Sequence, residues 1–136
     1  MALMLPPNWC LFFLRDPEKA FTMERLRECL RAEGLSVTGE TEPLAVQYEK
    51  RPGPTLFVSI SRGGHLETIV RSLVGRGRKY RKLIPGIDTE VKVEFQDLEE
   101  VLDDLTTLNH VQWGLQAGTG GLGYNSWNQA FFGPDE

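Results

Sequence analysis

The chain has 136 residues, with 15 basic and 19 acidic side chains and a formal net charge of −4. This length predicts one domain, residues 1–136, and a hydrophobic content of 40% excludes a disordered chain. The acidic balance argues against a dedicated nucleic-acid binder, because such proteins neutralise phosphates with a basic excess. Cys10 and Cys29 lack the spacing of a metal or redox motif and are too few for a disulfide scaffold. We therefore expect reduced thiols and a cytoplasmic location.

The amino-terminal half predicts a strand, a helix and three further strands. Residues 9–15 (WCLFFLR) form an apolar run that is far too short to span a bilayer, so we interpret it as a strand buried on both faces. Asp16 with Pro17, or alternatively Thr22, can cap the helix that follows, and Gly34 can end it. Three short strands are expected after this helix, over residues 35–40, 44–49 and 55–61.

A strand that runs directly into a helix is the clearest pattern in the carboxy-terminal half. Val91, Val93 and Phe95 alternate with charged residues, which is typical of a half-buried strand. Asp97 then stands where a helix N-cap belongs, and the helix is expected to cover residues 97–117. The core-facing stripe of this helix is expected to comprise Leu98, Val101, Leu102, Leu105 and Leu108.

Glycines set the limits of the remaining elements. Gly63 and Gly64 end the third short strand, and a helix is expected from His65. The glycine-rich segment 118–123 follows a helix and precedes a strand, the reverse of a phosphate-binding loop, so we interpret it as a helix-terminating turn. The last strand is expected to contain Tyr124, Trp127 and Phe131. The order β-α-β-β-β-α-β-α-β predicts an α+β fold, with a single antiparallel or mixed sheet and two or three helices packed on it.

The outer face of the helix over residues 97–117 carries a group of carboxylates. Glu99, Glu100, Asp103 and Asp104 lie opposite the apolar stripe, where water or a partner is their expected neighbour. Paired-carboxylate catalysis needs a shared desolvated cleft and a calcium loop needs a DxDxDG pattern, and the sequence predicts neither. Aromatic residues with amide neighbours in the tail are typical of interface hot spots. The predicted partner-binding residues are Glu99, Glu100, Asp103, Asp104, Tyr124 and Trp127.

Two other interpretations are open on the sequence alone. Residues 71–82 hold six basic side chains and Tyr80, and an aromatic ring within a basic run can stack on bases. The first alternative is therefore a regulatory or accessory module that contacts nucleic acid through this segment. The second is a small enzyme with an unrecognised site that would use His65 or His110. Neither histidine has a metal ligand at suitable spacing and no nucleophile motif occurs, so we expect no catalytic residue, metal or cofactor.

The chain resembles the small stand-alone α+β proteins of bacteria that include immunity proteins of polymorphic toxin systems. The resemblance rests on its length, on the segment 93–105 (VEFQDLEEVLDDL) and on the aromatic tail 123–132 (GYNSWNQAFF). It implies inhibition by tight binding, in which an acidic face covers the basic substrate cleft of a toxin. The expected function is a non-enzymatic, immunity-type protein inhibitor of a cationic toxin domain, with no membrane association and no nucleic-acid partner.

Overall fold

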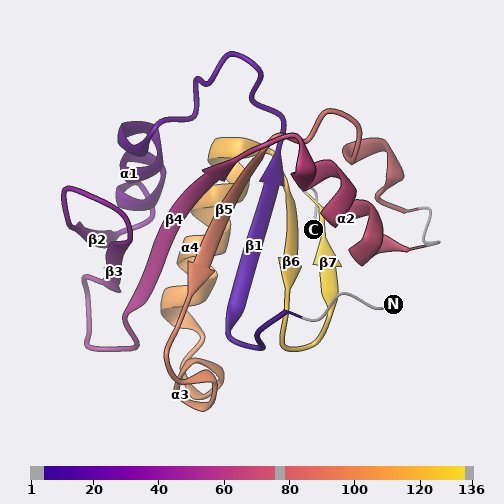
Figure 1. Ribbon diagram of the computed structural model, residues 1–136. Helices are drawn as coiled ribbons and strands as arrows, with labels where there is room; N and C mark the ends of the chain where they lie inside the picture. Colours follow the sequence, from indigo (N-terminus) through magenta and orange to yellow (C-terminus); the bar gives the residue numbers. More distant parts are fainter. Residues whose placement is uncertain (1–4, 76–78, 134–136) are drawn as a thin grey trace.

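A single antiparallel sheet forms the centre of the structure and carries helices on both faces (Figure 1). The computed structural model describes residues 5–75 and 79–133. Within them, seven strands lie in the order β2-β3-β4-β5-β1-β6-β7, and every neighbouring pair is antiparallel. The strands are β1 (Trp9–Leu14), β2 (Leu35–Thr38), β3 (Leu44–Tyr48), β4 (Leu56–Arg62), β5 (Thr89–Glu94), β6 (Leu122–Asn125) and β7 (Ala130–Phe132). The helices are α1 (Met23–Arg31), α2 (His65–Val74), α3 (Leu98–Asp103) and α4 (Thr106–Thr119), with a short 3₁₀ helix η1 (Arg81–Leu83).

The α+β class with one sheet is confirmed, and so is the prediction that β1 is buried on both faces. Cys10, Phe12 and Leu14 contribute to the core on one side of the sheet. Leu11 and Phe13 contribute to the core on the other side. This double burial follows from the position of β1 between β5 and β6, inside the sheet, where a strand has packing partners above and below.

Thr22, the second of the two candidate caps, is the N-cap of α1. Its side chain accepts a hydrogen bond from the backbone N–H of Arg25 at 3.2 Å, which satisfies one free donor of the first turn. The glycine-rich segment ends α4 as predicted: Gly120 is left-handed, with φ 61°, and its N–H donates to the carbonyl of Gln116.

The predicted order is wrong in its last part, where one long helix was expected over residues 97–117. The chain instead forms α3 and α4, separated at Asp104, whose backbone is extended with φ −138° and ψ 91°. The Asp104 Oδ1 accepts the backbone N–H of Thr106 at 3.2 Å. An aspartate that satisfies a nearby backbone donor competes with helix continuation, so one helix ends and another begins here.

The predicted last strand is a hairpin of two strands, β6 and β7. The chain reverses between them at Gln129, which has a left-handed φ of 57°, and Asn128 Oδ1 accepts the backbone N–H of Ala130 at 3.1 Å. Trp127 consequently lies in the turn and not in a strand. Tyr124 and Phe131 face each other across the hairpin as register partners.

Helices α1 and α4 pack together on one face of the sheet. Gly114 of α4 makes their close approach possible, because a Cβ at this position would lie 2.8 Å from the carbonyl oxygen of Cys29. The core beneath the two helices is formed by residues that include Leu26, Leu30, Val58, Val91, Val93, Leu108, Val111 and Leu115.

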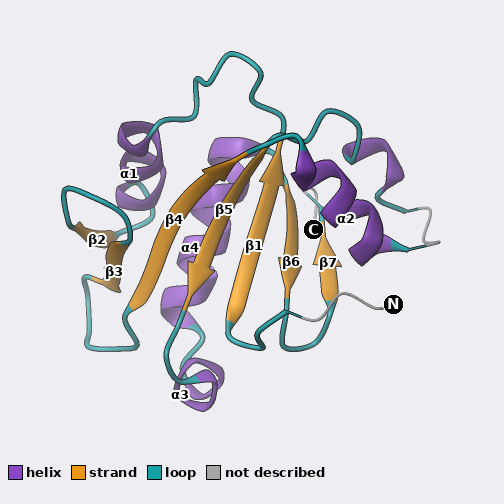
Figure 2. Cartoon of the chain, viewed as in Figure 1, coloured by secondary structure: helices purple, strands orange, loops and turns teal. Residues whose placement is uncertain are grey.

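The opposite face of the sheet is only half covered (Figure 2). Helix α2 and the segment 80–87 pack over β1, β6 and β7 through Leu66, Val70, Ile84, Ile87 and their neighbours. Over β4 and β5 this face remains accessible, and we name it the open sheet face. Its half-buried or exposed side chains are Trp9, Phe57, Ser59, Ser61, Glu90, Lys92 and Glu94.

A partly buried polar network joins the ends of β1, β4 and β5. The Asp16 carboxylate accepts the backbone N–H groups of Ala20 and Phe21 at 2.8 and 2.9 Å. It also pairs with the Arg62 guanidinium at 2.7 Å, and Arg62 donates in turn to the Thr89 hydroxyl. Burial by itself raises the pKa of Asp16, but these hydrogen bonds and the Arg62 charge outweigh it and hold the pKa below its ordinary value.

Candidate protein-binding surface

The short helix α3 leaves the end of β5 and presents carboxylates to solvent. Asp97 is its N-cap as predicted, because Asp97 Oδ1 accepts the backbone N–H of Glu100 at 3.2 Å. Val101 is buried and fixes α3 against the core. Glu99, Glu100 and Asp103 are exposed, so three of the four predicted acidic residues form one accessible group. We name α3 with these carboxylates the acidic surface.

Asp104, the fourth predicted carboxylate, is engaged within the protein. Its Oδ1 pairs with the Arg51 guanidinium at 3.1 Å in addition to its hydrogen bond from Thr106. The hydrogen bonds from Thr106, and the nearby Arg51 charge, lower the pKa of Asp104 below its ordinary value. Asp104 therefore sets the angle between α3 and α4 and is not a free charge of the acidic surface.

Leu102 and Leu105 were expected in the core, and this expectation is wrong. Their residue exposures are 44% and 39%, because the break at Asp104 turns them away from the stripe that Val101 and Leu108 continue. Leu102 follows Glu99 by three positions and precedes Asp103 directly, so it lies among the exposed carboxylates on α3. The acidic surface therefore includes an apolar side chain that no described residue buries.

The Leu102→Ala variant is expected to change the free energy of unfolding by less than about 0.5 kcal/mol, because this side chain is already largely in water. Leu108→Ala removes a side chain that is only 2% exposed, and should cost at least about 2 kcal/mol. Urea unfolding of both variants measures the difference, provided that the m-values agree. Equal losses in the two variants would contradict this placement of α3.

The two predicted aromatic residues lie in different environments. Tyr124 on β6 is 5% exposed beneath α2, and its ring contacts Phe131 at a centroid distance of 4.6 Å. Burial raises the pKa of its phenol, and the side chain is inaccessible to a partner. Trp127 is half-buried and meets Phe95 edge-on at 5.8 Å, close to where β5 leads into α3. Only Trp127 is therefore placed to adjoin the acidic surface.

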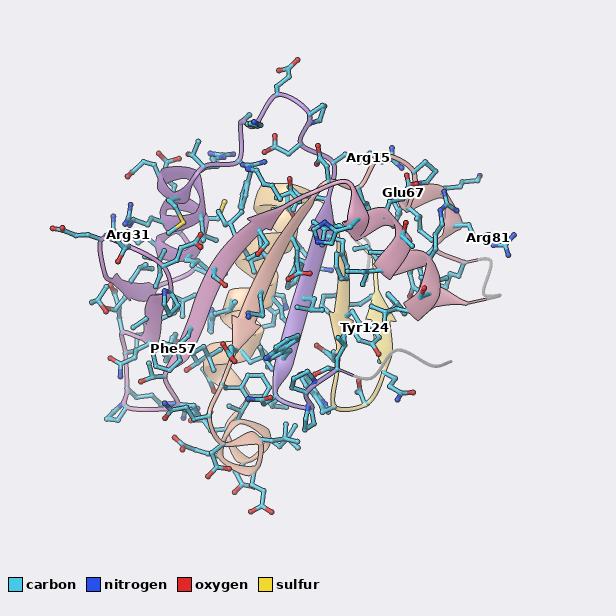
Figure 3. The ribbon with its side chains drawn as sticks, viewed as in Figure 1. Arg15, Arg31, Phe57, Glu67, Arg81 and Tyr124 are labelled. Atoms are coloured by element: carbon cyan, nitrogen blue, oxygen red, sulfur yellow. The ribbon has the colours of Figure 1, made fainter. Side chains whose placement is uncertain are left out.

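Two accessible aromatic residues were missed by the sequence analysis. Phe57 in β4 lies on the open sheet face, well apart from Tyr124 (Figure 3). Its alternation with Leu56 and Val58 was the available signal, since it places an aromatic ring on the polar side of a strand. Trp113 on α4 is 53% exposed and lies outside the core positions of that helix. The helical spacing of those core positions was the available signal for it.

A pocket lies between the acidic surface and the open sheet face and connects them. It has a volume of about 290 Å³ and lies between α3 and the loop that joins β3 to β4. Phe57 from the open sheet face and Glu100 from the acidic surface both line it. The two surfaces are therefore continuous through this pocket.

The described part of the basic segment 71–82 is engaged within the protein only in part. Arg71 pairs with Glu67 at 3.7 Å. Tyr80 donates from its hydroxyl to the carbonyl of Phe131 at 3.2 Å and packs on the Phe131 ring, so its ring is not a free stacking platform. Arg81 and Lys82 are exposed, whereas residues 76–78, with two of the six basic side chains, lie outside the described residues. Nucleic-acid contact at this segment stays a prediction of the alternative interpretation.

The two histidines lie far apart on the fold and in different surroundings. His65 begins α2, and its ring packs over Gly63. His110 on α4 stacks on Tyr48 at a centroid distance of 4.7 Å, and its Nδ1 is 3.8 Å from the Glu33 carboxylate. Among residues 5–75 and 79–133, no group of histidine, cysteine and acidic side chains is arranged to hold a metal ion.

The geometry defines an antiparallel α+β protein with a half-open sheet and an acidic surface at one end of that sheet. No family model, curated protein or solved structure matches the chain. Along the described parts of the chain, no helix has both the length and the apolar character needed to cross a membrane.

Proposed function

We propose that this protein is a non-enzymatic binding module that recognises a cationic protein through the acidic surface. The observation that carries the proposal is the exposure of Glu99, Glu100 and Asp103 beside Leu102 on one short helix. None of these three carboxylates forms an ion pair with another residue in the described ranges 5–75 and 79–133. Their charge is therefore available to a partner.

In such a contact, charge acts on the rate of association and apolar area acts on the rate of dissociation. Complementary potentials raise the rate of diffusional encounter, and by a larger factor at low salt than at high salt. Neighbouring like charges on a helix repel by a few tenths of a kcal/mol per pair, and a cationic partner relieves that repulsion. Leu102 supplies apolar area that can be desolvated on contact, which slows dissociation. The combination is suited to fast and lasting binding.

The specific role that we propose is immunity-type inhibition, in which the acidic surface covers a basic cleft of a toxin domain. This role is supported by the resemblance of the short α+β chain to bacterial immunity proteins. This role requires a toxin-type protein encoded beside this one, and the test is co-expression with the product of the neighbouring gene. Growth arrest by the toxin alone and restored growth with both proteins is the expected result.

The co-expression result needs a binding measurement to separate inhibition from indirect effects. The purified toxin domain and this protein should form a complex whose affinity falls as salt rises. Absence of a toxin-type neighbour, or rescue without a detectable complex, would overturn the proposed role.

A further inference from the structure

The pocket between α3 and the β3–β4 loop has a mixed lining of apolar and polar residues. Pro54, Phe95 and Val101 line it and are buried, while Phe57 lines it as a half-exposed ring. Its volume of about 290 Å³ falls just below the roughly 300–1,000 Å³ of pockets that hold drug-sized molecules. The pocket therefore fits a single side chain better than a cofactor.

Two carboxylates line the same pocket, and both are exposed. Asp97 is held in place because its Oδ1 caps the first turn of α3 through the N–H of Glu100. The Glu100 carboxylate forms no hydrogen bond or ion pair with another residue of the described ranges. Cross-strand register places Glu94 opposite Phe57 on the open sheet face, but its carboxylate accepts a hydrogen bond from the Trp9 indole at 3.2 Å and does not line the pocket. The Phe57 ring thus shares the pocket lining with the two exposed carboxylates of Asp97 and Glu100.

We propose that this pocket binds the side chain of an arginine from the cationic partner. The inference rests on the proposed function and names the group that the acidic surface recognises. A guanidinium is planar and weakly hydrated, so it can stack on the Phe57 ring while its N–H donors reach the carboxylates of Asp97 and Glu100. The methylene stem of the same side chain can pack on the apolar part of the lining.

Arginine is a better occupant than lysine because the two side chains differ in hydration and in shape. The lysine ammonium is compact and strongly hydrated, and it would lose hydration beside the Phe57 ring. It also cannot stack a planar group on the Phe57 ring. The chemistry of the lining therefore selects the guanidinium.

The test is an NMR titration of the folded, isotope-labelled chain with Nα-acetyl-arginine methylamide. We expect saturable shifts that are confined to the backbone amides of the pocket, including those of Phe57 and Val101. The neutral citrulline analogue should give no saturable shift, and the lysine analogue should bind at least threefold more weakly. Shifts of equal size over the whole of α3, or equal binding of the lysine or citrulline analogue, would overturn the proposal.

Matched variants locate the binding energy. Glu100→Gln is expected to lower the affinity for the arginine probe about threefold, which is the scale of an exposed charge pair. Phe57→Ala should lower this affinity by a similar factor, because stacking on the ring is lost. Glu18→Gln makes the same charge change at an exposed residue in the loop after β1, which neither lines the pocket nor belongs to the acidic surface, and it should leave binding unchanged. Equal weakening by Glu18→Gln and Glu100→Gln would show general charge attraction and overturn the pocket assignment.

Failure of this inference can be distinguished from failure of the proposed function. If the arginine probe does not bind, yet charge reversal at Glu99 and Asp103 slows association with the toxin domain, only the pocket assignment is wrong. If the probe does not bind and charge reversal changes nothing, the acidic surface itself is wrongly assigned.

Discussion

Replacing Asp16 with alanine is expected to lower the free energy of unfolding by roughly 2–3 kcal/mol, because backbone donors that are left without an acceptor cost about 1–3 kcal/mol. The variant leaves the Arg62 charge without its partner and the backbone N–H groups of Ala20 and Phe21 without their acceptor. All three groups belong to segments that meet at the ends of β1 and β4. Urea unfolding at neutral pH measures the effect.

The effect of Asp16→Ala should depend on pH in a definite direction. The pKa of Asp16 is lowered in the folded protein, so folding favours the ionised carboxylate. Its contribution is fully present above about pH 4, the ordinary pKa of an aspartate. The contribution is lost as the pH falls from there through the lower folded-state pKa, and the wild-type protein and the variant should converge in stability.

Glu18→Ala provides the control for this experiment. Glu18 belongs to the same loop as Asp16 but is exposed, so its removal should change stability by no more than about 0.5 kcal/mol. A pH-independent loss in the Asp16 variant would indicate a packing defect and not a lost ion pair. Equal losses at Glu18 and Asp16 would contradict the network.

Local patterns were sufficient to predict most of the sheet. The apolar run of β1 and the alternation of β5 each depend only on neighbouring residues and on which faces are buried, and the structure confirms both. Thr22 was available as a cap because capping also acts within one turn of a helix. In each case the pattern that predicts the element is carried by residues within a few positions of one another.

The break between α3 and α4 depends on a contact that periodicity does not show. Leu98, Val101, Leu105 and Leu108 keep helical spacing through the break, so the pattern predicted one helix. The competing interaction is the hydrogen bond that Asp104 Oδ1 accepts from the backbone N–H of Thr106. Asp104 also pairs with Arg51, which lies 53 residues away in the sequence, so a tertiary contact adds to the local one.

The candidate site was predicted only in part, because tertiary packing decides which of its residues are accessible. Three carboxylates on α3 are exposed as expected, because helical spacing alone places them opposite Val101. Tyr124 was misassigned because the hairpin puts it on the side of the sheet that α2 covers. The open sheet face follows from where α2 packs, and no pattern within β4 or β5 reports the position of a helix from another segment.

Charge reversal at Glu99 and Asp103 is expected to slow association with the toxin domain about tenfold or more at low salt. These residues are one helical turn apart and exposed, so two lysines would replace attraction by repulsion over the same area. Steering of this kind raises on-rates by roughly 10- to 1,000-fold, and its loss should also flatten the salt dependence of association. Stopped-flow mixing at several salt concentrations measures both effects.

The control for charge reversal is a variant with the same change in net charge at a distant place. Glu18→Lys with Glu40→Lys alters two exposed carboxylates in the loops that follow β1 and β2, and it should slow association far less. Leu102→Ala should instead speed dissociation and leave association nearly unchanged, because apolar contact acts after encounter. If both charge variants slow association equally, the partner responds to the overall charge of the protein. The acidic surface on α3 would then have no special part in binding, and the interface would have to be sought on another face.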